Sequence, residues 1–384
     1  PQAIIDWEKE VNINSGHLPT TQPLERMILM NRKTFIVISI SFCLLAFVFM
    51  NTAMAEQKVL NILTWAGYNE DRIIKPFEEK YNCKVNSKNF SGDEQMLTIW
   101  SASKPGTWDV VNPDGPWVKV LAAQGKIRKL DAAKYPLDDL FPIFQRFPQH
   151  WEGNTLWGVA SRWGFYGIAY NTKYVTKEEA KSWKAMWDPK FKGKVGIYGW
   201  YLPNMGNFGR YLGFENPYDI GMDQLKQLEK TLLELKPQVA TITLTASELI
   251  QALANESVWM APAGNWAAVT LKEQGLPIEH VVPDEGAVSW TESLCITSDS
   301  KNPDLAEKFL QWMLSPEIQA KLAWADAFHA ATPSRKAAQF LKPEQAEILR
   351  MTDAGVDIVK RVSPRQLPKD EEAWKDVWLK FKGE

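Results

Sequence analysis

The chain has 384 residues, 44 of them Lys or Arg and 46 Asp or Glu, so its formal net charge is −2. This balance gives no indication of the basic face that nucleic acid would need, and we expect no nucleic-acid partner. The length suffices for two lobes of ordinary domain size.

The beginning of the sequence predicts export. Residues 1–26 start with Pro and are polar and irregular, so we interpret them as a non-native or upstream leader. Residues 27–55 have the order of a signal peptide: a basic start at Arg32 and Lys33, an apolar run, and the small-residue site Ala53-Met54-Ala55. We predict cleavage after Ala55 and a periplasmic product. The alternative is an uncleaved anchor, because the apolar run is near the lower limit for spanning a bilayer.

From residue 58 onward, the apolar spacing alternates between the periods of strands and helices. The expected order is strand, helix, strand, helix, strand, at residues 59–64, 71–80, 83–90, 93–103 and 108–111. Such an order is typical of a parallel sheet covered by helices. The next helix, at 117–124, is expected to end at Gly125, which can adopt the left-handed conformation of a helix C-terminus.

The second half of the chain repeats this mixture of strands and helices. Its expected elements are a long strand at 161–171, helices at 222–235 and 246–255, a strand at 258–262, and helices at 304–314 and 316–323. No low-complexity linker separates the halves, which predicts strands that run from one lobe into the other.

Aromatic and acidic residues gather where predicted strands end. Ligands of open α/β sheets bind beyond the carboxyl ends of the strands, and the loops at those positions carry Trp65, Tyr68, Asp114, Trp200, Trp266, Trp290 and Glu292. Indole faces attract cations, so a cleft with these walls suits an ammonium group. The alternative for each Trp is a place in the core, which we expect for Trp100, Trp259 and Trp312 because they lie on apolar faces.

Motifs for catalysis and metal binding are not found in the sequence. His150, His280 and His329 lack the spacing of zinc ligands, and neither a Gly-x-Ser-x-Gly elbow nor a phosphate loop occurs. We therefore expect no catalytic residue, no metal and no cofactor. An enzyme on the same scaffold is the alternative of another class, and His329 is the one His placed for that role.

Several short motifs occur together in a characteristic order. They are Leu63-Thr64-Trp65-Ala66-Gly67-Tyr68, Trp108-Asp109-Val110-Val111, Gly125-Lys126-Ile127, Trp163-Gly164, Gly167-Ile168-Ala169-Tyr170-Asn171 and Trp290-Thr291-Glu292-Ser293-Leu294. In this order and spacing, the chain resembles the periplasmic spermidine/putrescine-binding proteins of ABC importers from Lys58 to about Lys342.

The resemblance implies an α/β periplasmic-binding-protein fold of type II. Two lobes, each a mainly parallel sheet flanked by helices, are expected to be joined by crossing strands and to close by a hinge. Residues 56–166 with 290–325 would form lobe 1, and 167–289 with 326–384 lobe 2. The implied topology places the strands of Cys83 and Cys295 about three positions apart, roughly 14 Å, which predicts two free thiols.

The resemblance also implies roles for single residues. Trp65 and Tyr68 match aromatic residues that hold a polyamine chain, Trp290 matches a stacking Trp, and Glu292 stands where an acid pairs with a ligand amine. Asp114 stands where members often have Ser and adds a carboxylate. The chain departs from the pattern at Gly67, where polyamine binders commonly carry Glu.

Two further candidates follow from position alone. Arg162 would clamp a ligand carboxylate if it faces the cleft; otherwise it points to solvent or to an internal acid. His329 is the second candidate for contact with the ligand.

The expected function is therefore capture of a small amine-containing ligand, a polyamine before others, by a monomeric protein that delivers it to ABC permease subunits. A monoamine, a quaternary ammonium compound or a zwitterionic amino-acid derivative is the alternative ligand. A sensor that presents the ligand to a receptor is an alternative role.

Overall fold

The computed structural model describes residues 57–383. The predicted leader, the signal peptide and the cleavage site after Ala55 lie outside the described residues. Lys58–Glu384 form one compact unit. Among the helices described in this unit, none combines the length and the apolarity needed to cross a bilayer.

The first strands of this unit are parallel, as their order along the sequence predicted. β1 (Lys58–Thr64) lies between β2 (Cys83–Asn89) and β3 (Val110–Val111) and pairs in parallel with both. Parallel neighbours need a crossover connection, and helices α2 (Asp71–Tyr81) and α3 (Asp93–Ala102) provide it. The carboxyl ends of these strands therefore lie at one edge of the sheet.

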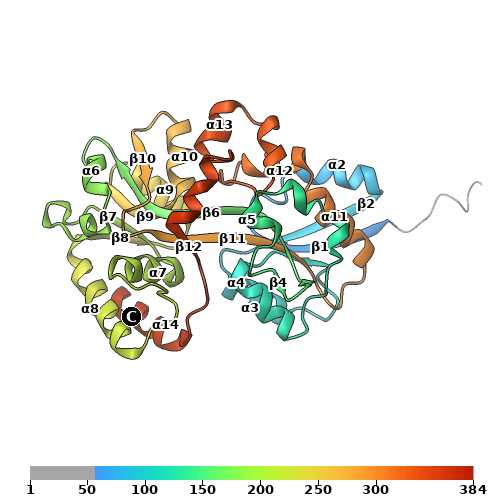
Figure 1. Cartoon of the computed structure of the whole chain (residues 1–384), viewed down its shortest axis with the longest axis horizontal. Coiled ribbons are helices and arrows are strands. Elements are labelled where there is room, and N and C mark those ends of the chain that lie inside the picture. The colour runs from blue at the N-terminus through green and yellow to red at the C-terminus, as the bar shows by residue number, and fades with distance from the viewer. Residues whose placement is uncertain (1–56, 384) are drawn as a thin grey trace, which may run out of the picture. The chain divides into compact units, whose positions relative to one another are not determined.

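Two long antiparallel strands join the lobes. β6 (Val159–Asn171) and β11 (Ala287–Ile296) are neighbours at the centre of the strand order β2-β1-β3-β11-β6-β9-β7-β8. All 13 residues of β6 are buried, because protein covers both faces of the strand. Figure 1 shows the pair running between two groups of strands and helices, which is the two-lobed architecture expected from the sequence.

The second group of strands continues from β6. β9 (Met260–Gly264) pairs antiparallel with β6, and β7 (Val195–Tyr198) pairs in parallel with both β9 and β8 (Val239–Thr243). The helices that follow these strands are α7 (Tyr201–Tyr211), α8 (Met222–Leu235), α9 (Ala246–Ala254) and α10 (Asn265–Glu273).

The remaining α-helices and strands complete the two lobes. They are α4 (Gly115–Ala123), α5 (Pro142–Gln145), β4 (Trp151–Glu152), β5 (Thr155–Leu156), α6 (Lys177–Ala180), β10 (Ile278–Val281), α11 (Pro303–Met313), α12 (Pro316–Ala323), α13 (Pro343–Ile348), β12 (Val362–Pro364) and α14 (Glu371–Lys382). β12 pairs in parallel with β11 and so brings the C-terminal segment against a crossing strand.

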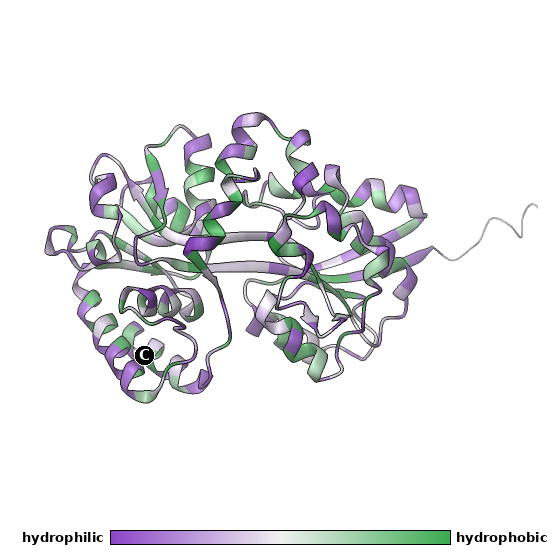
Figure 2. Ribbon diagram, viewed as in Figure 1, coloured by the Kyte–Doolittle hydropathy of each residue, from purple (hydrophilic) through white to green (hydrophobic). Residues whose placement is uncertain are grey.

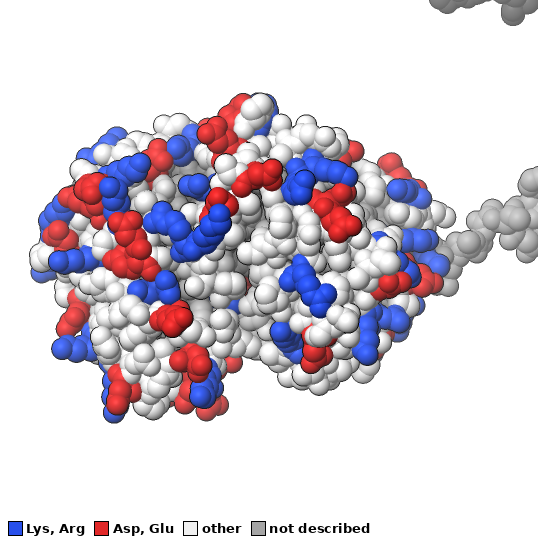
Figure 3. All heavy atoms as spheres, in the orientation of Figure 1, with Lys and Arg blue, Asp and Glu red and all other residues white. Residues whose placement is uncertain are grey.

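The core lies between the sheet and its helices, and Figure 2 shows apolar residues on the strands and on the inward faces of the helices. Trp100, Trp259 and Trp312, expected in the core, pack against it but are only half-buried. Each indole instead has a lysine ammonium above its ring. Figure 3 shows acidic and basic side chains interspersed on the face in view.

Cys83 and Cys295 are both buried and free, as predicted. Cys83 lies on β2 and Cys295 on β11, and β1 and β3 separate these two strands. The strand order thus confirms the topological reason for expecting two thiols.

Candidate functional site

A cavity of about 350 Å³ lies where the carboxyl ends of the strands meet the crossing strands. Its lining residues come from the ends of β1, β2, β3, β7, β8 and β9, from β6 and β11, and from two later loops. They are Trp65, Ala66, Phe90, Ser91, Asp114, Tyr166, Tyr198, Trp200, Thr245, Ala246, Ser247, Ile250, Trp266, Trp290, Glu292, Ala327, Phe328 and Arg365. The strand-end rule selected the same edge of the sheet.

Six of the nine candidates from the sequence lie on this lining. They are Trp65, Asp114, Trp200, Trp266, Trp290 and Glu292. The ring of Trp65 lies 4.6 Å from that of Phe90 and 6.4 Å from that of Trp200, so the wall is continuous from β1 to β7. In a second aromatic group, Phe328 lies 6.3 Å from Trp266 and 6.5 Å from Trp290.

Two glycines allow the indoles to lie against the strands. A Cβ at Gly164 would be 2.6 Å from Cζ2 of Trp290, its cross-strand neighbour. A Cβ at Gly264, the last residue of β9, would likewise overlap the indole of Trp266. Because neither position has a side chain, the two indoles can lie close to the backbone of the strands.

Glu292 does not present a free carboxylate to the cavity. Its Oε2 accepts a hydrogen bond from Nε of Arg162 at 2.8 Å, and its Oε1 accepts one from Nη2 at 3.0 Å. The hydroxyl of Tyr68 donates to Oε2 at 2.8 Å. Burial, followed by the charge of Glu292, raises the pKa of Tyr68 well above its usual value, so this hydroxyl stays a donor. Of the places considered for Arg162, the structure supports the internal acid.

Asp114 is the second lining carboxylate, and Arg365 neutralises it. Its Oδ2 accepts from Nε of Arg365 at 2.9 Å and lies 2.6 Å from Nη2. The Arg365 guanidinium also donates to the Tyr166 hydroxyl at 3.2 Å and lies 4.1 Å from the Trp200 ring centroid. The cavity thus holds two carboxylates, each with its own buried arginine.

Asp93 adds a third carboxyl group next to Asp114. Its Oδ1 accepts from the backbone N–H of Asp114 at 2.9 Å, whereas its Oδ2 is buried without a hydrogen-bond partner. Burial, followed by the charge of Asp114, raises the pKa of Asp93 well above its usual value. Burial also raises the pKa of Asp114, against the opposing effect of Arg365.

Three candidates from the sequence lie outside the lining, and the structure corrects their place. Tyr68 and Arg162 are fully buried behind it, where they bind Glu292. His329 packs its ring on Trp324 at 4.1 Å, with its Nε2 2.5 Å from Oε2 of Glu273. The polar groups of Tyr68, Arg162 and His329 form hydrogen bonds within the protein. The positions of these residues in the sequence did not reveal this.

The most important residue missed by the sequence analysis is Arg365. The resemblance ends near Lys342, and no motif marks the residue. Pairing of β12 with β11 orients it, because the Arg365 N–H donates to the Ser289 carbonyl at 2.8 Å just after the strand ends. Phe90, Tyr198 and Phe328 were also missed, although Phe90 and Tyr198 stand at strand ends and were open to the same rule.

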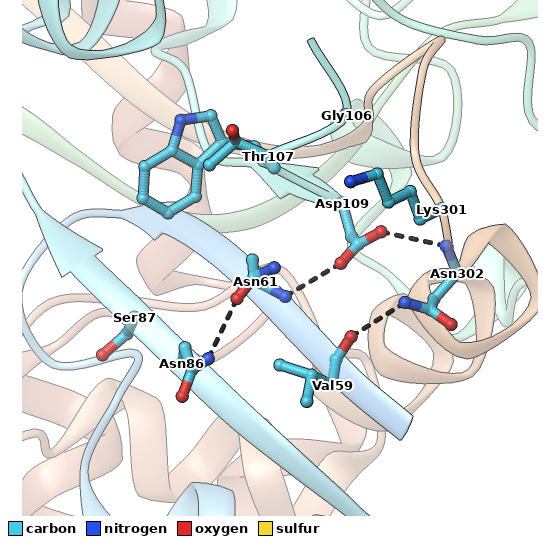
Figure 4. A pocket seen from close by; sticks show the side chains of 10 residues that line it. Val59, Asn61, Asn86, Ser87, Gly106, Thr107, Asp109, Lys301 and Asn302 are labelled. Atoms are coloured by element: carbon cyan, nitrogen blue, oxygen red, sulfur yellow. Dashed lines mark hydrogen bonds between the residues drawn. The ribbon is translucent and has the colours of Figure 1, made fainter. Parts of the chain in front are cut away.

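A second depression, of about 460 Å³, lies near the beginning of β1 (Figure 4). The Asp109 carboxylate there accepts from the backbone N–H groups of Asn61 at 2.9 Å and Asn302 at 3.0 Å. The Asn302 side chain donates to the Val59 carbonyl, and that of Asn86 to Asn61. These polar groups already form hydrogen bonds with one another and are therefore less available to a ligand. The aromatic cavity is the better candidate for a binding site.

The aromatic cavity offers groups that can bind a cation. Within residues 57–383, no group of three His, Cys, Asp or Glu side chains is arranged to hold a metal ion. The lining offers aromatic faces, hydroxyl groups and two arginine-paired carboxylates. Aromatic faces and carboxylate oxygens both attract an ammonium group.

Comparisons with known proteins agree with this geometry. Residues 72–347 match the model of the bacterial extracellular solute-binding protein family. The chain is 26% identical to spermidine/putrescine-binding periplasmic protein 1 of Haemophilus influenzae, with 75% of this chain and 79% of that protein covered. It is also 26% identical to the spermidine/putrescine-binding periplasmic protein of Escherichia coli, with coverage of 77% and 84%.

A solved structure shows the same fold. The substrate-binding protein PotD of a spermidine/putrescine ABC transporter from Streptococcus pneumoniae superposes with a TM-score of 0.70 at 22% identity, over 85% of this chain and 99% of that one. These findings confirm the resemblance carried by the short motifs. The chain belongs to the bacterial extracellular solute-binding protein family.

Proposed function

We propose that this protein is the periplasmic solute-binding component of an ABC importer and that it captures a small amine, with polyamines as the first class of ligand. The observation that carries the proposal is the cavity of about 350 Å³ walled by Trp65, Trp200, Trp266 and Trp290, with the carboxylates of Asp114 and Glu292 in the same lining. A volume of this size suits a small molecule. The two relatives described above are named for spermidine and putrescine, both alkyl amines.

The aromatic walls supply the attraction in this proposal. A cation over an indole face gains about 0.5–2 kcal/mol, and more where water is excluded. Asp114 supplies the counter-charge: its Oδ1 accepts a long hydrogen bond from the Thr291 N–H at 3.4 Å, and an ammonium group would add to this oxygen. Both oxygens of Glu292 already accept hydrogen bonds from Arg162.

Closure of two lobes would complete the site. The expected division, residues 56–166 with 290–325 and 167–289 with 326–384, assigns Trp65 and Asp114 to one lobe and Trp200 and Trp266 to the other. Because both lobes line the cavity, bending of β6 and β11 would open it and closure would exclude water. The protein would act as a monomer, without catalysis, and pass its ligand to permease subunits in the inner membrane.

A thermal-shift and fluorescence screen tests this function. Putrescine, spermidine and cadaverine should stabilise the protein, by about 2.7 kcal/mol at a ligand concentration of 100 times Kd, and should change the fluorescence of the lining indoles. Trp200→Ala should weaken the response. Trp157→Ala, at a half-buried position outside the lining, is the matched control. If no amine raises Tm, or if Trp157→Ala weakens binding as much as Trp200→Ala, the proposal fails.

A further inference from the structure

The charge balance of the cavity depends on Arg162. The guanidinium is completely buried, yet it contacts three residues of the lining. It binds both carboxylate oxygens of Glu292, its Nη2 donates to the Ala66 carbonyl at 3.0 Å, and its centre lies 4.0 Å from the Phe328 ring centroid. A carboxylate, a carbonyl and an aromatic face are the groups that would surround a bound ammonium.

Gly67 makes room for this arrangement. Its φ of +98° is a conformation that favours glycine. A Cβ at this position would lie 3.2 Å from Nη1 of Arg162 and 3.0 Å from Cβ of Ala325. Nη1 itself is buried without a hydrogen-bond partner, so the guanidinium is held by its other nitrogens and by its fit between Gly67 and the ring of Phe328.

We infer that Arg162 is a specificity-determining residue: it occupies the cation position at Glu292, so that the cavity recognises one ammonium of its ligand and not a second. This inference rests on the proposed binding of amines. A second ammonium at Glu292 would lie beside the buried guanidinium, where like charges repel with little screening by solvent. Glu292 is then a counter-ion of the protein and not of the ligand.

The neighbouring carboxylate differs in its charge balance: the backbone of Asp114 bridges that of Glu292, but its side chain binds another arginine. Arg365 pairs with Oδ2 of Asp114, and the Asp93 carboxyl accepts from the Asp114 backbone N–H. Asp114 lines the cavity, and its Oδ1 accepts a long hydrogen bond from the Thr291 N–H at 3.4 Å. The ammonium that the cavity recognises is therefore placed at Asp114.

Putrescine and n-butylamine test the inference, because they share a butyl chain and differ in one ammonium. Calorimetry on the unmodified protein should give dissociation constants within about three-fold of each other, less than 1 kcal/mol apart. In Arg162→Ala, the vacated space and the unpaired Glu292 would accept the second ammonium. Putrescine should then bind at least about ten-fold more tightly than n-butylamine.

The ratio of the two affinities separates recognition from a general loss of structure. A purely structural role for Arg162 would weaken both amines equally and leave their ratio unchanged. Arg162→Lys keeps a cation at Glu292 and should preserve the ratio of the unmodified protein. If Arg162→Ala prefers putrescine no more than the unmodified protein does, or if the unmodified protein already prefers it about ten-fold, the inference is overturned.

A charge-balanced variant covers the case in which Arg162→Ala does not fold. Arg162→Met/Glu292→Gln removes both charges and leaves neither buried without a partner. Its putrescine affinity should stay within about five-fold of the unmodified protein, whereas a loss of more than about ten-fold would show that Glu292 binds the ligand and overturn the inference. Failure of putrescine, n-butylamine, spermidine and cadaverine alike to bind the unmodified protein would instead overturn the proposed function itself, and the inference with it.

Discussion

Arg162 and Glu292 face each other across β6 and β11 and form a bidentate ion pair, with N–O distances of 2.8 and 3.0 Å. The arginine is fully buried and the glutamate is 4% exposed. The two strands that carry them are the ones that join the lobes. The pair therefore determines both the stability of the crossing strands and the charge of the cavity.

Breaking the pair on one side should destabilise the protein strongly. Arg162→Met leaves the Glu292 carboxylate buried beside Tyr68 without its cation, which typically costs about 3–5 kcal/mol. Arg162→Met/Glu292→Leu removes both charges and should recover much of the loss. Urea denaturation followed by circular dichroism measures both variants, and equal destabilisation by the single and the double change would contradict this account.

Removing the charge of Asp114 should weaken amine binding. Asp114→Asn removes the carboxylate oxygen that is proposed to bind the ligand ammonium. It also leaves the Arg365 cation on the lining without its carboxylate partner, and this cation repels an ammonium. We expect at least a ten-fold rise in the Kd for putrescine, about 1.4 kcal/mol, by calorimetry. Asp376→Asn, at an exposed position on α14, makes the same chemical change away from the cavity and should leave Kd unchanged.

A single methyl group on β6 should disturb the aromatic wall. Gly164 is part of an extended strand, so alanine suits its backbone, but a Cβ there would lie 2.6 Å from the Trp290 indole. Gly164→Ala should push Trp290 into the cavity, change its fluorescence and weaken putrescine binding. Gly221→Ala is the control, because no atom lies within 4 Å of its Cβ position. Unchanged affinity in Gly164→Ala would show that Trp290 does not contact the ligand.

Stability should fall in acid because of two buried histidines. Burial lowers the pKa of His150 to about 3 and that of His280 to about 4. Below the ordinary pKa of about 6.5, the unfolded chain binds protons that the folded protein does not. Each histidine therefore reduces the unfolding free energy by about 1.4 kcal/mol per pH unit until its folded pKa is reached.

The contribution of His150 can be isolated. Its Nε2 lies 2.8 Å from the Ser293 hydroxyl, so glutamine can replace that hydrogen bond. Urea unfolding between pH 6.5 and 4.5 should show a shallower fall for His150→Gln than for the unmodified protein. Asp93 acts in the opposite direction, because its raised pKa favours the folded state as pH falls; it is common to both proteins and cancels in the comparison. Parallel profiles would contradict a neutral buried His150.

Local patterns were sufficient for many elements of the fold. The helices at Met222–Leu235 and Pro316–Ala323 have the bounds expected from the sequence, because their apolar spacing and flanking residues are local signals. Boundaries that depend on neighbouring strands were less accurate. β9 begins at Met260 and not at Val258, and β3 is limited to Val110–Val111.

The same distinction holds for the site. Trp65, Trp200 and Trp266 follow strand ends and line the cavity, since the direction of parallel strands places such residues at one edge of a sheet. Trp290, also predicted at a strand end, lines the cavity from within β11. The sequence did not reveal which residue neutralises each carboxylate of the cavity. Arg162 is 130 residues from Glu292, and Arg365 is 251 residues from Asp114.

The sequence by itself determined the fold class and predicted a site with aromatic walls at the strand ends, because periodicity is a property of short segments. Only the tertiary structure decided that each cavity carboxylate already has an arginine partner. Pairing of β6 with β11, and of β11 with β12, brings these residues together. A buried charge is stable only beside its counter-charge, so the electrostatics of the cavity follows from contacts between distant segments.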